Sequence, residues 1–459
     1  MNVVWLAAGK DCLKAMMFYN LLADEFTVRK LRRRFVFWAG AIAVGAGAVL
    51  FTAGSDLAMN LLSQLRKPFP WWPYVAAPLG ISLCVWLTRT VFVGAEGSGI
   101  PQTMAALTLS MDEGRDRLLS LRIALGKVML TVLALATGAS VGREGPTVQV
   151  GASIMHSLRR YARFSSADID RGLILAGGAA GVAAAFNTPL AGVVFAIEEL
   201  SRSFEARTSG TIITAVVVAG VTSLAIVGNY TYFGTTSAVM TEPHTWVAVP
   251  FCAVISGLLG GCFSLVMIKF VDLLPAPVRK FRLERPVMFA AACGVGIALI
   301  GFVSSGTTFG TGYAEAKLLL QNEAEPAAGF ALWKALATLL SYASGIPGGL
   351  FAPSLAVGAG IGAHLYSWAP LAPAGAMVVI SMAAFFAGVV HAPLTALVIV
   401  TEMTGNRSLT LPLMAAALIG RGASAMVCRG SLYRELAKPF LKKATDAQAV
   451  DQQPAEQAT

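Results

Sequence analysis

The stretch VGREGPTVQ, residues Val141–Gln149, places a guanidinium and a carboxylate inside a long apolar region of the chain. Ionisable groups at membrane depth are costly and by default mark a functional site. Gly142 and Gly145 free the backbone, and Pro146 suits the first turn of a helix, where its missing N–H is not needed. The stretch predicts a loop that enters a helix N-terminus, where unpaired N–H groups and the helix dipole favour an anion. A buried pair of Arg143 and Glu144 is the alternative.

The composition around this stretch is that of a membrane protein. Of the 459 residues, 56% are hydrophobic and only 13% are charged, whereas soluble domains carry about 25% charged residues. Ala335–Thr401 contains no Asp, Glu, Lys or Arg, and about 20 apolar residues suffice to cross a bilayer. Further uncharged runs are Val36–Ser55, Gly172–Ile197, Thr208–Thr241, Thr245–Ile268 and Pro286–Ala314. The chain is therefore predicted to cross a membrane several times.

The basic residues lie at the ends of these apolar runs. The net charge is +10, but this distribution is the positive-inside bias of membrane proteins and places both termini in the cytoplasm. Nucleic acid is therefore not expected as a partner. The six cysteines include no CxxC pair, and the four histidines show no ligand spacing. Neither a metal site nor a cofactor is predicted.

An internal repeat divides the chain. Pro146–Ala152 parallels Pro353–Ala359, and Thr188–Glu198 parallels Ala392–Glu402, with nine residues from proline to glutamate in both copies of the second pair. Apolar segments that are interrupted by Gly and Pro at matching places in two halves point to broken helices, whose N-termini meet an anionic substrate near the bilayer midplane.

The repeat sets the predicted domains. Residues 35–225 form the first transmembrane half and residues 245–435 the second, with a loop over residues 226–244 between them. Residues 1–34 are expected to be a cytoplasmic amphipathic segment. Residues 436–459 are expected to be a basic and then disordered cytoplasmic tail.

Two other stretches repeat the pattern of glycines followed by proline. In Gly97–Pro101 the Ser98 hydroxyl can donate a hydrogen bond to a dehydrated anion; a turn that only caps a helix is the alternative. In Gly345–Pro353, which has no charged residue, backbone N–H groups would hold an anion, above all those of Leu350 and Phe351. A close helix–helix contact through the glycines is the alternative there.

Four ionisable residues outside these stretches are also candidates. Glu198 and Glu199 end an apolar run, and their side chains diverge by about 100° on a helix. One can pair structurally while the other faces a proton path, or both mark the helix end at the membrane surface. Lys127 either raises the local positive potential or pairs with Glu198 or Glu402. Tyr433, which begins the last helix before the basic tail, is by itself typical of a tyrosine at the membrane interface.

Together these stretches resemble the three signature motifs of the CLC chloride channel and transporter family, in the family's order and at suitable intervals. With Glu198, Glu199 and Tyr433 the resemblance covers most of residues 35–435. One departure is Gln102, where many relatives have an acid. The motif residues are Gly97, Ser98, Gly99, Ile100 and Pro101, then Gly142, Arg143, Glu144, Gly145 and Pro146, and last Gly349, Leu350, Phe351 and Pro353.

The resemblance implies an all-α fold: a polytopic membrane protein of two inverted helical repeats, with broken helices that meet at the bilayer midplane. It implies a homodimer with one pore in each subunit, surrounded by membrane lipid. The C-terminal nucleotide-binding domains of eukaryotic relatives are not expected, so a prokaryotic member in a bacterial inner membrane is predicted.

The resemblance also implies roles for single residues. Ser98 and Tyr433 would donate hydroxyls to a chloride ion, together with the N–H groups of Leu350 and Phe351. Glu144 would be the gating glutamate, which occupies an anion site when ionised and leaves it when protonated. Glu199 stands where proton-coupled members have their internal proton glutamate.

These roles predict coupled chloride/proton antiport, so the expected partners are chloride ions and protons. A passive, gated chloride channel, in which Glu144 gates but Glu199 does not relay protons, is the alternative. An enzyme is not expected, because no HExxH, Walker A or nucleophile-elbow motif lies on these segments.

Overall fold

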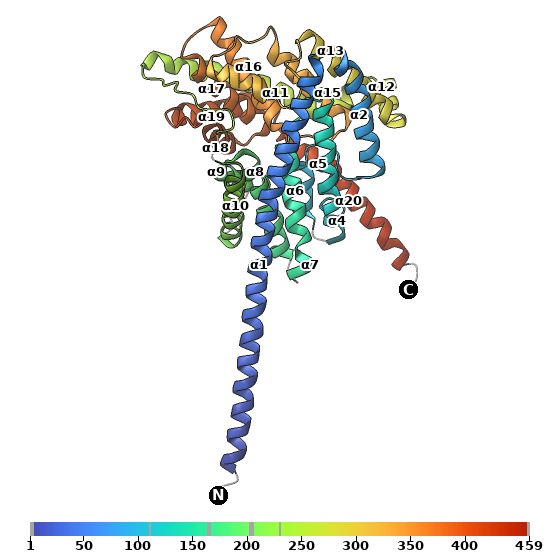
Figure 1. Cartoon of the computed structure of the whole chain (residues 1–459), viewed down its shortest axis with the longest axis vertical. Helices are drawn as coiled ribbons and strands as arrows, with labels where there is room; N and C mark the ends of the chain where they lie inside the picture. The colour runs from blue at the N-terminus through green and yellow to red at the C-terminus, as the bar shows by residue number, and fades with distance from the viewer. Residues whose placement is uncertain (1–3, 110–111, 163–166, 202–205, 229–230, 457–459) are drawn as a thin grey trace.

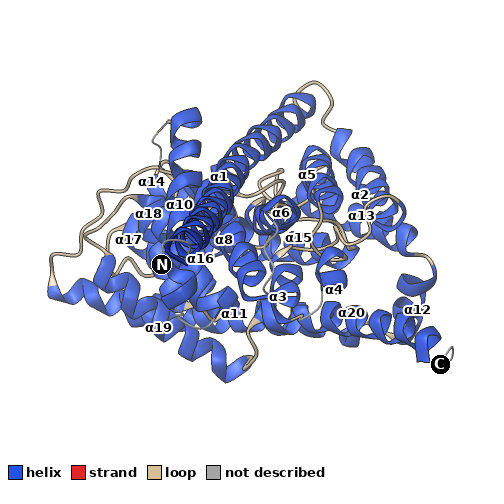
Figure 2. Ribbon diagram, turned by 90° about the horizontal axis from the view of Figure 1, so that it is seen from below, coloured by secondary structure: helices blue, strands red, loops and turns tan. Residues whose placement is uncertain are grey.

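The computed structural model describes residues 4–109, 112–162, 167–201, 206–228 and 231–456. These residues form helices joined by loops, with no β-strand among them (Figure 2). The predicted all-α class is confirmed.

The first helix of the first half extends beyond the helix bundle. Helix α1 (Val4–Arg66) projects far beyond the other helices at its N-terminal end (Figure 1), and the predicted boundary at residue 34 falls inside it. The remaining elements are α2 (Trp72–Thr90), α3 (Ile100–Thr108), α4 (Asp112–Asp116), α5 (Leu121–Ala136), α6 (Glu144–Ser157), α7 (Arg159–Ala162), α8 (Ala167–Phe186), α9 (Pro189–Phe195), the π-helix η1 (Ala196–Ser201) and α10 (Ala206–Val227).

The second half follows after the connecting segment. Its elements are the 3₁₀-helix η2 (Pro243–Val247), α11 (Ala248–Leu273), α12 (Ala276–Glu284), α13 (Pro286–Val303), α14 (Tyr313–Gln321), α15 (Phe330–Ser344), α16 (Phe351–Trp368), α17 (Ala374–Val390), α18 (Pro393–Thr404), α19 (Thr410–Val427) and α20 (Leu432–Glu456). Helix α20 differs from the prediction of a disordered tail, since it continues to Glu456. Ala, Glu, Gln and Lys, which favour helices, are frequent in it.

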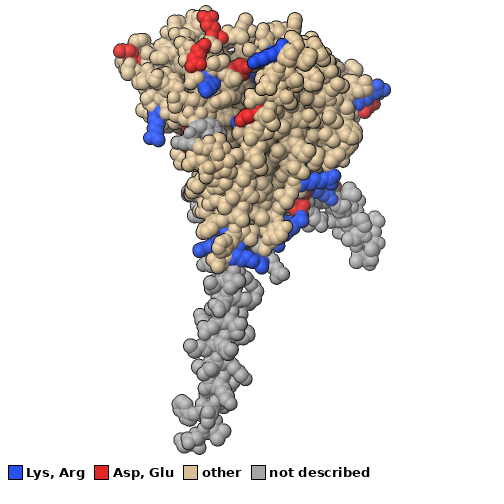
Figure 3. All heavy atoms as spheres, viewed as in Figure 1, with Lys and Arg blue, Asp and Glu red and all other residues tan. Residues whose placement is uncertain are grey.

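Six helical segments in the described part of the chain are long and apolar enough to cross a membrane. They are Leu31–Arg66, Gly114–Ala136, Gly210–Val227, Pro243–Leu273, Pro286–Val303 and Thr410–Val427. Their outer surfaces carry large apolar side chains, such as Leu50, which is 73% exposed. In Figure 3 uncharged residues cover the middle of the visible surface, and Lys and Arg gather where α1 leaves the bundle. The chain is a multi-pass membrane protein.

The two halves exchange contacts at equivalent places. Glu198 of the first half accepts hydrogen bonds from the backbone N–H groups of Leu394 (3.1 Å) and Thr395 (2.6 Å) at the start of α18. Glu402 of the second half accepts those of Leu190 (3.3 Å) and Ala191 (2.8 Å) at the start of α9. Each repeat thus satisfies the free N–H groups of the other's broken helix.

Helices α6 and α16 begin at the middle of the molecule and run apart. In Figure 1, α6 continues downward to α7, whereas α16 lies in the upper part of the bundle. Helix α17 packs beside α16 and is buried from Gly375 to Val390. This opposed arrangement of broken helices positions the site.

Candidate functional site

Backbone hydrogen bonds join the three motif loops. The Gly97 N–H donates to the Ile346 carbonyl (3.3 Å), and the Gly348 N–H donates to the Gly97 carbonyl (3.1 Å). Gly142 and Gly349 exchange two bonds, of 2.7 and 2.6 Å. The loops before α3, α6 and α16 therefore meet at one place, as the sequence motifs predict.

Glycine is required where these loops approach each other. Gly99 caps the start of α3 with φ of 98°, a conformation that L side chains rarely adopt. A methyl group on Gly145 would overlap the Ser98 side chain, and one on Gly349 would lie 3.0 Å from the Gly145 nitrogen. Gln102, which departs from the family pattern, accepts the Gly99 N–H (3.0 Å) and donates to the Glu96 carbonyl.

Two hydroxyl groups face the centre of this junction. Ser98 and Tyr433 are buried, and their hydroxyls lie close together. Among the described residues neither hydroxyl has a hydrogen-bond partner that fits. The Tyr433 ring packs against Phe351, the first residue of α16, with ring centroids 5.8 Å apart. Because buried hydroxyls are normally paired, this junction suits a ligand that accepts hydrogen bonds.

The start of α16 is enclosed by apolar rings. Phe351 packs against Phe186 (6.2 Å), Phe195 (5.7 Å) and Phe386 (4.8 Å). Leu350, which caps the helix, is buried as well. In such surroundings the free N–H groups of the helix start have no competing water, which strengthens their attraction for an anion.

Glu144 is the first residue of α6 and is fully buried. The Tyr232 hydroxyl donates to its Oε1 at 3.3 Å, and the backbone N–H of Ala352 in α16 lies near the carboxylate. The helix thus begins at Glu144, two residues before Pro146 and inside the stretch that was predicted to be a loop. The carboxylate lies between the starts of α6 and α16.

Arg143 forms an ion pair with an acid of α1. Its Nη1 donates to Asp56 Oδ1 in α1 at 2.6 Å and to the Thr52 carbonyl at 3.1 Å. Its guanidinium also lies over the Tyr232 ring, 5.6 Å from the centroid. Arg143 thus forms its ion pair with Asp56 and not with Glu144, although its charge also acts on the neighbouring Glu144 carboxylate.

The adjacent acids Glu198 and Glu199 of η1, the π-helix that follows α9, point to different partners. Glu198 caps α18, as described above. Glu199 is buried in η1 and accepts a hydrogen bond from the Ser431 hydroxyl at 3.1 Å. Glu199 and Glu144 both lie within electrostatic reach of the Tyr433 hydroxyl. The expectation that one acid pairs structurally is confirmed for Glu198.

Lys127 holds the Ser98 loop through backbone carbonyls. Its Nζ donates to the Glu96 and Gly97 carbonyls at 3.0 and 2.9 Å, so the alternative of a pair with Glu198 or Glu402 is wrong. Lys334 holds a loop in the second half in the same way, donating to the Thr308 and Gly310 carbonyls at 2.9 and 2.7 Å. The two lysines are 207 residues apart, like Pro146 and Pro353, and this signal was available in the sequence.

A cavity of about 730 Å³ lies next to the gate motif. Its charged and phenolic lining residues are Asp56, Arg66, Arg143, Tyr232, Tyr313 and Glu315. Because Arg143 and Tyr232 line this cavity and also contact the Glu144 region, the cavity adjoins the buried carboxylate.

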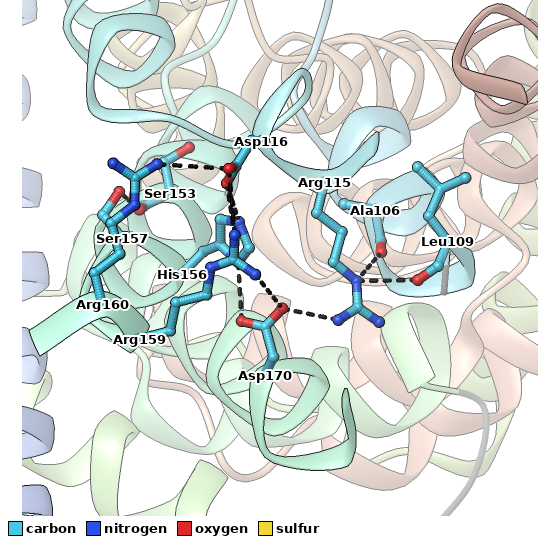
Figure 4. A network of polar contacts seen from close by, with 10 residues as sticks. All are labelled: Ala106, Leu109, Arg115, Asp116, Ser153, His156, Ser157, Arg159, Arg160 and Asp170. Carbon is cyan, nitrogen blue, oxygen red and sulfur yellow. Dashed lines mark hydrogen bonds and ion pairs between the residues drawn. The ribbon is translucent and has the colours of Figure 1, made fainter. Parts of the chain in front are cut away.

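A second polar cluster lies at the opposite end of α6 (Figure 4). The His156 ring nitrogens face Asp170 (Nδ1, 2.9 Å) and Asp116 (Nε2, 2.8 Å). Arg115 donates to Asp170 at 2.8 Å, and Arg159 donates to Asp116 at 3.2 Å. This cluster ties α4, α6, α7 and α8 together.

Fold and site together define a polytopic membrane protein in which the starts of broken helices from two repeats meet at a buried junction. A family model described as "Voltage gated chloride channel" matches residues 80–425. The chain belongs to this family, and the resemblance predicted from the motifs is confirmed.

Known proteins of this family are similar over most of their length. The H(+)/Cl(-) exchange transporter ClcA of Yersinia pestis bv. Antiqua (strain Angola) is 30% identical over 414 residues, covering 84% of this chain and 83% of the relative. ClcA of Vibrio vulnificus (strain YJ016) is 28% identical over 449 residues, covering 88% and 89%.

Solved structures share the fold. A slow cyanobacterial Cl⁻/H⁺ antiporter aligns with a TM-score of 0.76 and 25% identity, covering 89% of this chain and 98% of that one. A CLC-type fluoride/proton antiporter aligns with a TM-score of 0.70 and 22% identity, covering 90% and 98%.

Proposed function

We propose that this membrane protein exchanges chloride for protons. The observation that carries the proposal is the position of the Glu144 carboxylate between the starts of α6 and α16, where backbone N–H groups favour an anion. Relatives that match over more than four-fifths of the chain are named H(+)/Cl(-) exchange transporters.

Chloride binds at the junction beside Glu144. The hydroxyls of Ser98 and Tyr433 donate to it, together with the backbone N–H groups of Leu350 and Phe351. The support is that both hydroxyls are buried without a fitting partner in the described chain and that Leu350 and Phe351 start α16. An ion held by dipoles and hydroxyls alone can also leave, as transport requires.

Glu144 couples the two ions. Its ionised carboxylate and chloride compete for the same N–H groups, because like charges repel in a buried site. Protonation removes this competition, so that chloride enters as the carboxyl group leaves. One side chain with two positions therefore links proton uptake to chloride movement.

Glu199 passes protons between Glu144 and the cytoplasm. It is buried beside Ser431 and near Tyr433, on the η1 segment that follows α9. A buried carboxylate in a membrane protein is a typical proton relay. Its presence favours exchange over the alternative of a passive channel.

On the family resemblance we further propose that the protein is a homodimer with one pore in each subunit and that it lies in a bacterial inner membrane. Both termini lie on the cytoplasmic side. Arg32 to Arg34 precede the first apolar run, and Arg159 and Arg160 follow α6, as the positive-inside bias requires. Lys and Arg gather where α1 leaves the bundle (Figure 3).

The experiment uses purified protein in liposomes under an outward chloride gradient, with chloride and pH electrodes in the external solution. Exchange predicts that chloride efflux drives protons into the vesicles against their gradient. Chloride efflux with a flat pH trace, while an added proton ionophore still gives its normal response, would establish the passive channel instead.

A further inference from the structure

Tyr232 lies in the segment that connects the two halves, a short distance after α10 ends at Val227. No motif of the sequence assigns it a role. Its side chain is buried, and its hydroxyl donates to Glu144 Oε1 at 3.3 Å. A residue from the connecting segment therefore contacts the carboxylate on which coupling depends.

The Tyr232 ring is held from several sides. Phe186, Phe233 and Tyr313 contact it edge to face, with centroids 5.5, 5.1 and 4.9 Å away. The Arg143 guanidinium lies over the ring at 5.6 Å. Such contacts fix an aromatic ring in one orientation, so the hydroxyl is directed at Glu144 before any ion arrives.

The backbone of the segment is fixed as well. The Phe233 N–H donates to the Met403 carbonyl at the end of α18 (2.9 Å). Asn406 donates to the Thr236 and Ala238 carbonyls at 3.0 and 2.8 Å. The connecting segment is thus attached to the second half, while its tyrosine contacts the glutamate of the first.

We propose that Tyr232 is a positioning residue that holds ionised Glu144 in its anion-occupying position. A phenol donates a stronger hydrogen bond to a carboxylate than to a neutral carboxyl group. Tyr232 therefore stabilises the ionised gate and releases it on protonation. The proposal rests on the gating role of Glu144 given above.

Other charged and titratable groups surround Glu144, but the Tyr232 hydroxyl is the side-chain donor that contacts its carboxylate. Arg143 is adjacent, but its Nη1 is occupied by Asp56 of α1. Tyr433 of α20 approaches from the chloride side. The remaining titratable groups line the outer cavity: Arg66 of α1, with Tyr313 and Glu315 of α14.

The test compares transport against pH for the wild type, Tyr232→Phe and Tyr313→Phe in liposomes. Tyr313→Phe is the matched control, because it removes a hydroxyl from the same aromatic cluster. Without the Tyr232 donor the ionised carboxylate is less stable. The transport profile of Tyr232→Phe is therefore expected to move by about one pH unit toward higher pH, while the control keeps the wild-type profile.

A second pair of variants separates this proposal from the role of Glu144. Glu144→Gln and the double variant Tyr232→Phe/Glu144→Gln are expected to carry chloride equally and without pH dependence, which also shows that the tyrosine variant folds. An unshifted profile in Tyr232→Phe, an equal shift in Tyr313→Phe, or a Tyr232 effect that persists in the Glu144→Gln background would overturn the role of Tyr232. Proton coupling retained in Glu144→Gln would instead overturn the proposed gate.

Discussion

Glu198 and Glu199 are neighbours in the sequence and contact different parts of the molecule. Glu198 accepts the N–H groups at the start of α18, whereas Glu199 is buried beside Ser431. Both residues lie in the π-helix η1, where successive side chains point in different directions, and this is enough to separate the two environments. The structural carboxylate and the proposed relay therefore differ by one position.

This separation predicts opposite phenotypes for two matched variants. Glu199→Gln is expected to reduce proton movement about 10-fold or more while chloride still moves, because an amide cannot release a proton. Glu198→Gln is expected to keep coupling and to lower stability by about 1 kcal/mol, because a neutral acceptor caps α18 less well. Parallel flux recordings and thermal unfolding check both. Wild-type coupling in Glu199→Gln would move the relay elsewhere.

Ser98 carries a prediction about anion selectivity. Ser98→Pro removes the hydroxyl donor that the proposed site offers to chloride. The nitrate-to-chloride transport ratio is expected to rise on the order of 10-fold, as the loss of a specific hydrogen bond allows. Ser98→Ala separates the loss of the hydroxyl from the effect of the proline ring. An unchanged ratio in both variants would show that Ser98 does not contact the ion.

For single residues, the sequence predicts the members of the motifs better than the residues that contact them in the folded protein. Ser98 and Glu144 are recognisable because glycines and proline surround them locally. Asp56 and Tyr232 contact Arg143 and Glu144 from distant segments. No local pattern encodes such a tertiary contact, so neither residue could be predicted.

The site is formed by helices whose N-termini lie inside the molecule. Pro101, Pro146 and Pro353 each lie in the first turn of their helix, so helix starts could be predicted within two residues. The length of α20 could not be predicted, because polar composition alone does not distinguish a surface helix from a disordered tail.

The polar cluster around Asp170 joins α4, α6, α7 and α8, and its contribution to stability can be measured. Asp170→Asn leaves Arg115 and His156 without a buried carboxylate and is expected to cost about 3 kcal/mol of stability. Thermal unfolding in detergent, followed by tryptophan fluorescence, measures the loss. Glu284→Gln is the control, because its pair with Lys280 is exposed and contributes little. Equal stability of the two variants would contradict a structural role for the cluster.

On the scale of the whole molecule, the site exists only when both halves fold together. The first half contributes Ser98 and Glu144, and the second contributes Leu350, Phe351 and Tyr433. The reciprocal caps of Glu198 and Glu402 join the same two halves. The repeat could be predicted from the matching motifs. The exchange of helix caps between the halves could not, because repeated motifs show that two segments are similar and do not show which segments are in contact.

Exchange is the central claim, and the zero-current voltage of the reconstituted protein tests it most directly. Chloride is kept equal on both sides of a planar bilayer while a tenfold proton gradient is applied. Exchange predicts that this voltage moves by a measurable fraction of the ~59 mV that the gradient represents, and that Glu144→Gln abolishes the movement. A voltage that stays at zero in the wild type would contradict coupling and leave a passive chloride pore.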